Sequence, residues 1–148
     1  MSKVFKGRPV VAGTIQGKEA VVSHQGVNTL ASFQKSALFK KKQVICSDQN
    51  NPDLYQKNLT DKVICLPKTI GSTTGGMVLY CANKMQRSPA CMLFSEHIDS
   101  LAAAGAILAA VWGEDPMPTV DCLGKEFLDY VKDGMQITVA EDGTVTVE

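Results

Sequence analysis

The apolar positions along the chain fall into two patterns: short β-branched runs, and longer stretches with helical spacing. The short runs end at glycine, proline or polar clusters, which is typical of strands. They predict strands at residues 8–12, 20–23, 43–47, 62–66, 90–94 and 119–123. The longer stretches carry apolar residues three or four positions apart, which favours helices with one buried face. They predict helices at residues 75–86, 96–110 and 126–132.

The last part of the chain has the pattern of a β-hairpin. Two apolar runs, 135–140 and 144–147, flank the pair Asp142-Gly143, and Asp-Gly between such runs is a strong hairpin signal. Strands and helices alternate in the middle of the chain, which implies parallel strands joined by crossover helices. We therefore predict one α/β domain over residues 1–148, with a central parallel sheet flanked by helices and extra antiparallel β-strands at the termini.

The composition is that of an ordinary globular domain. Of the 148 residues, 45% are hydrophobic and 20% are charged, and the 15 basic and 15 acidic side chains cancel. A chain without net charge is not expected to bind nucleic acid over its whole surface. The longest uncharged and mostly apolar run, 101–113, has thirteen residues, whereas a membrane-spanning helix needs about twenty. We therefore expect neither a nucleic acid nor a membrane as partner.

The cysteines indicate the compartment. The chain has five of them, widely spaced and without a Cys-x-x-Cys motif. An odd number at such spacings favours reduced thiols over a disulfide framework or a metal site. No secretory signal peptide is recognised at the amino terminus. We therefore expect a cytoplasmic protein that holds no metal of its own.

The segment that could carry chemistry is Pro-Lys-Thr-Ile-Gly-Ser-Thr-Thr-Gly-Gly, residues 67–76. It follows a predicted buried strand and precedes a predicted helix, so free N–H groups at the helix start could bind an anion. Glycines let the backbone approach a ligand, and ligands of α/β proteins bind beyond the carboxyl ends of the strands. Gly71, Ser72, Thr73 and Thr74 are the candidate residues. A plain helix N-cap, formed by serine or threonine, explains the same pattern.

The motif differs from the known phosphate-binding loops. It lacks the Gly-Lys-Ser/Thr of a P-loop and the Gly-x-Gly-x-x-Gly of a dinucleotide-binding fold. A serine hydroxyl such as that of Ser72 could also act as a base, but only in a fixed positive field. The helix start could supply part of that field, and a cation from elsewhere or from a partner chain would have to supply the rest.

Other candidates are isolated residues. His24 and His97 have no cysteine, aspartate or second histidine at the spacing of a triad or metal site, and are interpreted as caps or surface residues. Arg8 and Arg87 are the only arginines. Arginine often holds a carboxylate or phosphate, although a surface salt bridge is the default interpretation for both.

Several segments in order resemble one known family. They are GRPVVAGTIQGKEAVVS, a Ser-Phe turn, a strand that ends in proline, IGSTTGGMVLY, SPACMLF, a helix rich in alanine and glycine, and MPTVD. This order is similar to that of the aconitase X swivel domain, and the resemblance spans almost the whole chain. IGSTTGGMVLY is its most specific part.

The resemblance implies a swivelling β/β/α fold and a role as the small subunit of a two-subunit hydro-lyase. The large catalytic subunit of the family holds an iron–sulfur cluster, so no cofactor is expected on this chain. The substrate would be a small hydroxy acid such as cis-3-hydroxy-L-proline, the substrate of bacterial relatives, while archaeal relatives dehydrate phosphomevalonate. The family's catalytic serine corresponds to Ser72. Gly71, Thr73 and the helix start that follows Thr74 would hold the substrate anion.

The chain departs from the family pattern at one loop. Many relatives carry Ser-Phe followed by Gly-Gly and an Asp-Pro turn, whereas residues 32–35 here are Ser-Phe-Gln-Lys. The acidic turn is represented only by Asp48, followed by Asn51 and Pro52. This loop could line the substrate cleft, so the resemblance does not fix the substrate.

Two other functions compete with the hydro-lyase subunit. The same glycine-rich loop could serve a non-enzymatic regulatory module that binds phosphate or another anion. A phosphohistidine swivel domain has a similar fold, but it needs a reactive histidine in a Gly/Thr loop, and neither His24 nor His97 lies in one.

Overall fold

The computed structural model describes residues 2–28, 32, 45–70, 89–98, 103, 106–107 and 117–148. The predicted helix at 75–86 lies outside these residues, as does most of the one at 96–110. The described strands are β1 (Lys3–Lys6), β2 (Arg8–Val11), β3 (Ile15–Val22), β4 (Val27–Asn28), β5 (Val63–Leu66), β6 (Thr69–Ile70), β7 (Cys91–Phe94), β8 (Thr119–Asp121), β9 (Gln136–Val139) and β10 (Thr144–Val147). The described helix is α4 (Lys125–Tyr130).

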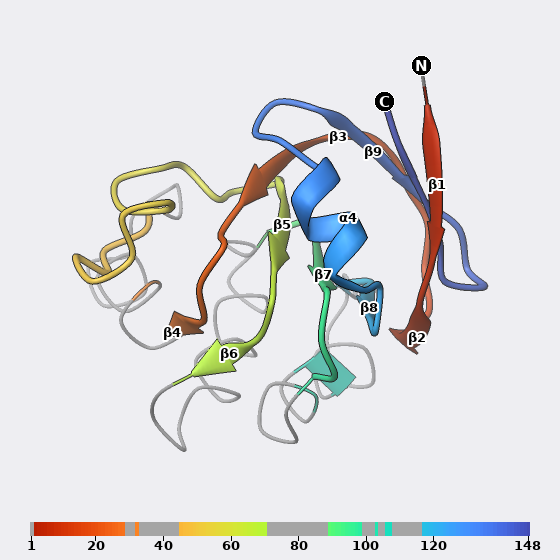
Figure 1. The fold of residues 1–148 in the computed structure, drawn as a ribbon, viewed down its shortest axis with the longest axis horizontal. Coiled ribbons are helices and arrows are strands. Elements are labelled where there is room, and N and C mark those ends of the chain that lie inside the picture. The colour runs from red at the N-terminus through yellow and green to blue at the C-terminus, as the bar shows by residue number, and fades with distance from the viewer. Residues whose placement is uncertain are drawn as a thin grey trace.

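Eight of these strands form one sheet in the order β1-β10-β9-β3-β5-β7-β8-β2. The pairs β3–β5, β5–β7 and β7–β8 are parallel. The strands near the two chain ends pair antiparallel, β1, β10 and β9 on one side and β2 on the other. Figure 1 shows the terminal strands curving around one side of the molecule, with both chain ends close together. The predicted class, α/β with a parallel centre and antiparallel ends, is confirmed.

The central strands are buried on both faces, so alternate residues belong to two different cores. On β5, Val63 and Cys65 belong to one cluster and Ile64 and Leu66 to the other. Parallel strands that are covered on both sides have this continuous apolar character. The first cluster also includes residues of α4 and of the terminal strands.

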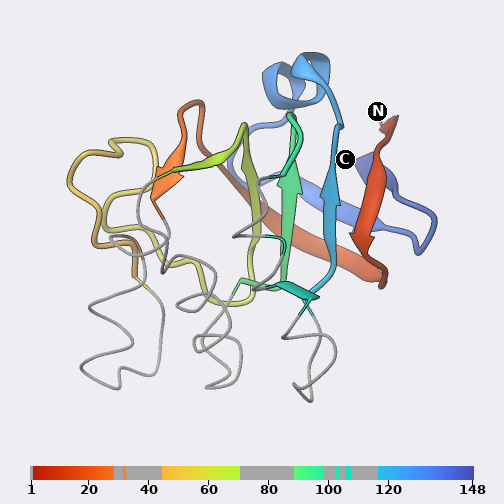
Figure 2. The same ribbon diagram turned by 90° about the horizontal axis from the view of Figure 1, so that it is seen from below.

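Aromatic side chains of helix α4 pack against the first core. Phe127 is fully buried and meets Phe5 of β1 edge-on, with ring centroids 5.3 Å apart. The Tyr130 ring also packs against Phe5 in a tilted arrangement, with ring centroids 5.9 Å apart. Figure 2 shows α4 close to the ends toward which β7 and β8 point. The helix therefore joins the terminal strands to the parallel centre.

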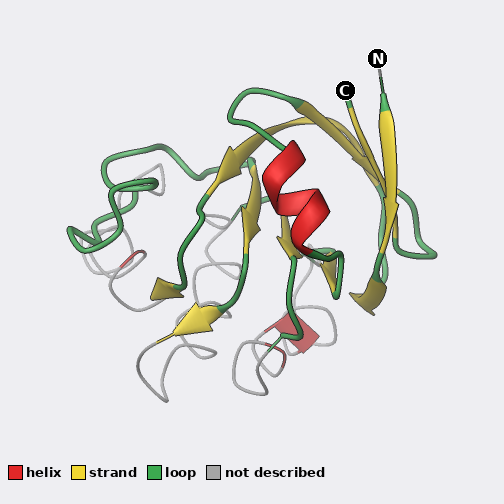
Figure 3. Cartoon of the chain, viewed as in Figure 1, coloured by secondary structure: helices red, strands yellow, loops and turns green. Residues whose placement is uncertain are grey.

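Most of the predicted strands are present, and the differences have local causes. The prediction of a strand at 43–47 is wrong for its described part, because residue 45 forms only an isolated bridge with Asn58. Cys46 instead exchanges backbone hydrogen bonds with the turn residues Gln56 and Lys57, and Figure 3 draws this stretch as loop. The helix predicted from residue 96 does not begin there, because the N–H of Ile98 donates to the Asp121 carboxylate.

The edge strand β2 is tied to β8 by one ion pair. Arg8 lies opposite Asp121 in the register, and its Nε and Nη2 donate to the two carboxylate oxygens at 2.9 and 2.7 Å. The Asp121 side chain is completely buried. Burial raises its pKa, but the Arg8 guanidinium, the N–H of Ile98 and the Cys122 thiol together outweigh that effect and hold the pKa below its usual value.

We expect Gly7→Ala to destabilise the fold more than a change at any open glycine. An added Cβ would lie 2.5 Å from the backbone oxygen of Asp121 and 2.7 Å from a Val120 side-chain carbon, so the backbone would have to move. Overpacking of this kind costs roughly 1–3 kcal/mol, and a clash with backbone favours the upper end. Urea unfolding measures the loss. Gly134→Ala is the control, because its Cβ would meet nothing within 4 Å and only its φ of +89° is strained. Equal losses for the two variants would contradict the close packing at Gly7.

We also expect the ion pair between Arg8 and Asp121 to make the free energy of unfolding depend on pH in the acidic range. Because the folded pKa of Asp121 lies below its unfolded value, the carboxylate stabilises the fold above about pH 4 and loses this effect as the pH falls through the folded pKa. The measurement is the free energy of unfolding between pH 2 and 7 for the natural chain and for Asp121→Asn. The difference between them should be constant near neutral pH and shrink below about pH 4. A difference that grows on acidification would overturn the assignment.

Candidate functional site

The carboxyl ends of the four parallel strands form one edge of the sheet, and the segments that leave it carry the polar residues of interest. The short strand β6 follows β5 at this edge and pairs parallel with β4, so Ile70 lies beside Asn28. Residue 71, where the glycine-rich segment begins, comes directly after Ile70. Gly71, Ser72, Thr73 and Thr74 themselves lie outside the described residues, and their roles stay predictions.

Backbone hydrogen bonds join the turns at this edge into a continuous row. Ser95 and Glu96, just after β7, donate to the carbonyls of Leu66 and Pro67 at 3.0 and 3.2 Å. Cys122 donates to Glu96 at 3.1 Å, and Gly124 to Ser95 at 2.9 Å. Cys122 adopts a left-handed φ of +59° to make this turn, which is uncommon for a side chain other than glycine, asparagine or aspartate. The residues after β5, β7 and β8 are therefore fixed relative to one another.

A cluster of chemically active side chains lies at the β8 end of this row. Arg8 pairs with Asp121, and its Nη2 also lies 3.1 Å from Nε2 of His97. The hydrogen bonds and charge of Asp121 raise the pKa of Arg8 further above its ordinary value. Cys122 as a whole residue is exposed. The pKa of its thiol is nevertheless raised, first by partial loss of hydration at the sulfur and second by the negative charge of Asp121. The guanidinium is therefore permanently charged, whereas the thiol is held in its neutral form.

Arg8 and His97 were separate candidates in the sequence, and their contact was not predicted. They are 89 positions apart, and His97 has no partner at a recognisable spacing. His97 is exposed, in agreement with the predicted surface residue, and the structure adds its contact with Arg8. Asp121 was not predicted at all. A buried-strand pattern that ends in an acidic residue, Thr-Val-Asp, was the only signal for it.

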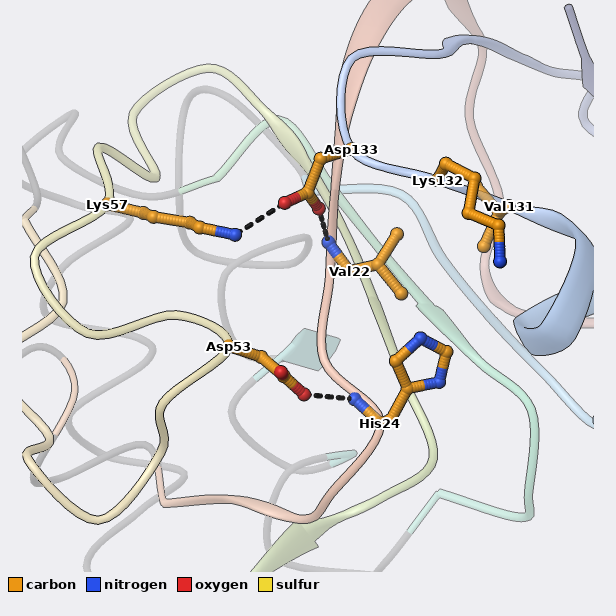
Figure 4. A pocket seen from close by; sticks show the side chains of 7 residues that line it. All are labelled: Val22, His24, Asp53, Lys57, Val131, Lys132 and Asp133. Carbon is orange, nitrogen blue, oxygen red and sulfur yellow. Dashed lines mark hydrogen bonds and ion pairs between the residues drawn. The ribbon is translucent and has the colours of Figure 1, made fainter.

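A polar depression lies at the end of β3 (Figure 4), with a volume of about 330 Å³. Asp133 accepts a hydrogen bond from the backbone N–H of Val22 and is paired with Lys57. Asp53 accepts one from the N–H of His24 at 2.8 Å. Both carboxylates therefore hold backbone or pair with lysine, and the depression joins the loop at 45–62 to the end of β3 and the segment after α4. These contacts give both carboxylates in the depression a structural role.

The loop that departs from the family pattern is also anchored at this end of β3. Asn51 is buried, its Nδ2 donates to Ser23 Oγ at 3.1 Å, and its Oδ1 accepts from the N–H groups of Asp53 and Leu54. Asp48 accepts from the N–H of Asn50 at 3.0 Å. Asp48 and Asn51, the remnant of the family's acidic turn, thus shape the loop. The Ser32 carbonyl accepts from the N–H of Ser47 at 3.1 Å, while the buried Oγ of Ser32 has no hydrogen-bond partner among the residues that the structure describes.

Neither a metal site nor a membrane span emerges from the part of the chain that the structure describes. In that part, no group of three or more histidine, cysteine, aspartate or glutamate side chains could hold a metal ion. Its four cysteines are free, and burial raises the pKa of the Cys65 and Cys91 thiols. None of the described helical residues belongs to a helix long and apolar enough to cross a bilayer.

Comparison with known proteins adds the family. A model of the aconitase X swivel domain matches residues 4–147. The phosphomevalonate dehydratase small subunit of Methanosarcina mazei is 28% identical over 135 residues, which cover 91% of this chain and 83% of that protein. The subunit of the same name from Pyrococcus furiosus is 29% identical over 144 residues, which cover 97% and 94%.

A solved structure shares the fold. The holo-form crystal structure of Thermococcus kodakaraensis aconitase X matches with a TM-score of 0.81 at 24% identity, over 99% of this chain and 98% of that chain. The predicted family and the swivel-type fold are thereby confirmed. The chain belongs to the aconitase X swivel domain family.

Proposed function

We propose that this chain is the small subunit of an aconitase-X-type dehydratase and is inactive without a large catalytic subunit. The observation that carries the proposal is the family match over residues 4–147. It is supported by relatives of nearly the same length that are named as small subunits of a dehydratase. A protein of this size that works as a small subunit needs a partner to complete its site.

Dehydration of a hydroxy acid needs a base and a leaving hydroxyl. We assign the base to Ser72, which would remove the proton from the carbon beside the substrate carboxylate. The assignment is supported by its place in the sequence, two residues after β6 and beyond the buried parallel strand β5, because ligands of α/β proteins bind beyond the carboxyl ends of such strands. The serine oxygen must carry negative charge as it takes the proton, so it requires nearby N–H dipoles or a cation.

The remaining residues of the loop bind the substrate in this proposal. Gly71 allows close approach of the backbone, and Thr73 and Thr74 offer hydroxyl and N–H donors to a carboxylate or phosphate. The large subunit would supply the iron–sulfur cluster, whose Lewis acidity assists departure of the hydroxyl.

The named relatives direct the choice of substrate. Both relatives compared above are named as small subunits of phosphomevalonate dehydratase. We therefore place a phosphorylated hydroxy acid first, with cis-3-hydroxy-L-proline as the second candidate. The different loop sequence at residues 32–35 is a reason to test both.

The alternative function is an anion-binding regulatory module. The same glycine-rich loop would then bind phosphate without a partner and without turnover. Isothermal titration of inorganic phosphate into the isolated chain distinguishes the two functions, because a subunit whose site is completed by a partner should bind phosphate weakly on its own.

We expect Ser72→Ala to abolish turnover in the reconstituted complex and to leave assembly intact, because the change removes one hydroxyl and no packing group. Loss of a general base typically costs about 10²–10⁴-fold in rate. The measurement is kcat together with analytical ultracentrifugation of the complex. Ser2→Ala, at an exposed serine near the chain start, is the control and should keep full activity. Turnover retained in Ser72→Ala would exclude this serine as the base.

We further expect the complex to dehydrate phosphomevalonate with a kcat/KM at least tenfold above that for cis-3-hydroxy-L-proline. A site built to bind a phosphate discriminates strongly against an analogue that lacks it, because its polar groups are left unpaired. Formation of the unsaturated product from each acid is followed by mass spectrometry. A preference for the proline derivative would reverse the assignment of the substrate but not that of the subunit.

A further inference from the structure

The Arg8 guanidinium is held in one orientation by two side chains. Its Nε and Nη2 donate side-on to Asp121 at 2.9 and 2.7 Å, and Nη2 has its second contact with His97 at 3.1 Å. These contacts use the Nε–H and both N–H groups of Nη2. The two N–H groups of Nη1, on the other side, have no acceptor in the described part of the chain.

The His97 ring is oriented to support this arrangement. Its Nδ1 lies 2.8 Å from the carbonyl oxygen of Ile98, and because a carbonyl can only accept, we assign the ring proton to Nδ1. The Nε2 of the neutral ring is then an acceptor and takes its hydrogen bond from Arg8. Each atom in the row from Ile98 through His97 to Arg8 thus has a matching role.

Burial differs sharply between the two partners of the ion pair. The Asp121 side chain is 0% exposed, whereas that of Arg8 is 53% exposed. A buried carboxylate must be paired, which accounts for the inner side of the guanidinium. The outer side remains available, and its orientation is fixed before any ligand arrives, so binding there costs little side-chain entropy. The two N–H groups of Nη1 can donate charge-assisted hydrogen bonds to the oxygens of a carboxylate or phosphate.

The position of the cluster connects it to the proposed site. Asp121 ends β8 and His97 follows β7, so both lie at the carboxyl edge from which residue 71 also departs. Only two backbone hydrogen bonds, Glu96 to Pro67 and Cys122 to Glu96, separate the turn before β6 from the turn after β8. An anion held by Arg8 would therefore lie at the same edge as β6, the strand that precedes the Gly71–Thr74 segment in the sequence.

We propose that Nη1 of Arg8 binds an oxyanion, a carboxylate or phosphate, while Asp121 and His97 hold the guanidinium in place. The inference rests on the proposed function and adds a specificity residue outside the glycine-rich loop. The oxyanion comes either from the substrate or from an acidic side chain of the large subunit. Arg8 would donate to an oxyanion in either case. Loss of Arg8 would weaken substrate binding if the substrate supplies the oxyanion, and subunit assembly if the large subunit supplies it.

The test must separate anion binding from the structural pairing with Asp121. In the double variant Arg8→Gln/Asp121→Asn, an amide pair replaces the ion pair, so the buried carboxylate no longer needs a cation. Arg8→Lys keeps the charge but removes the fork. Lys6→Ala is the control, because Lys6 is an exposed cation nearby whose described partner is Asp142, at 3.6 Å.

In the reconstituted complex, we expect the double variant to unfold near the temperature of the natural chain. If the substrate supplies the oxyanion, KM rises about tenfold or more, as expected for the loss of a charged hydrogen bond, with a smaller change in kcat. If the partner supplies it, the dissociation constant of the two subunits rises by a similar factor without substrate, and KM at saturating partner is unchanged. Arg8→Lys should show the same effect in weaker form, and Lys6→Ala neither.

Unchanged KM and unchanged assembly in a stable double variant would overturn the proposal and leave Arg8 a structural partner of Asp121. If the natural chain shows no turnover with any partner, the proposed function fails instead. The oxyanion site is then tested on the isolated chain, by following the Arg8 Nε–H and His97 ring signals in NMR while inorganic phosphate or acetate is added. Saturable shifts that the double variant lacks support the site, and their absence in the natural chain excludes it.

Discussion

Burial of the parallel strands on both faces is the constraint on which the rest of the structure depends. Residues of β5 and β7 alternate between two apolar cores, so neither face of the central sheet can present polar chemistry to solvent. The polar side chains of Arg8, His97 and Asp121 meet instead at the ends of strands. The carboxyl edge, where β3, β5, β7 and β8 end together, thereby becomes the place where a site can form.

One buried carboxylate organises that edge. Asp121 receives hydrogen bonds from Arg8 on the edge strand and from the N–H of Ile98 after β7. It therefore joins β2, β8 and the turn after β7 at a single point. The close approach of Gly7 to its backbone belongs to the same arrangement. An ion pair that holds strands together thus also fixes the orientation of the exposed side of Arg8, so stability and recognition have a common origin here.

The sequence predicted the centre of the fold better than its connections. Residues 63–66 and 91–94 are continuous apolar runs that only a doubly covered strand explains, and the Asp142-Gly143 turn fixed the hairpin. Residues 43–47 had a strand-like composition, but Cys46, in the described part of this segment, forms its backbone hydrogen bonds with Gln56 and Lys57 of the following loop. A local sequence pattern does not reveal that a segment will form its hydrogen bonds with a loop instead of a neighbouring strand.

The candidate site was predictable only where its residues are adjacent in sequence. The Gly71–Thr74 loop is a contiguous motif, so a pattern could identify it, and its role remains a prediction. The cluster of Arg8, His97 and Asp121 comes from three segments that meet through strand pairing, with 113 positions between Arg8 and Asp121. Nothing in the spacing of those residues indicates the contact, because the sheet order that brings β2 beside β8 is a property of the whole fold.

Whether this chain works as a subunit can be tested by affinity purification from its native cell extract without oxygen. The tagged chain would be isolated gently, and the proteins and iron that accompany it would be measured. If the chain is a subunit, we expect a larger, iron-containing protein to copurify in a fixed ratio to this chain. A monomer that purifies alone, under conditions in which the fold is intact, would contradict the account and favour an independent anion-binding module.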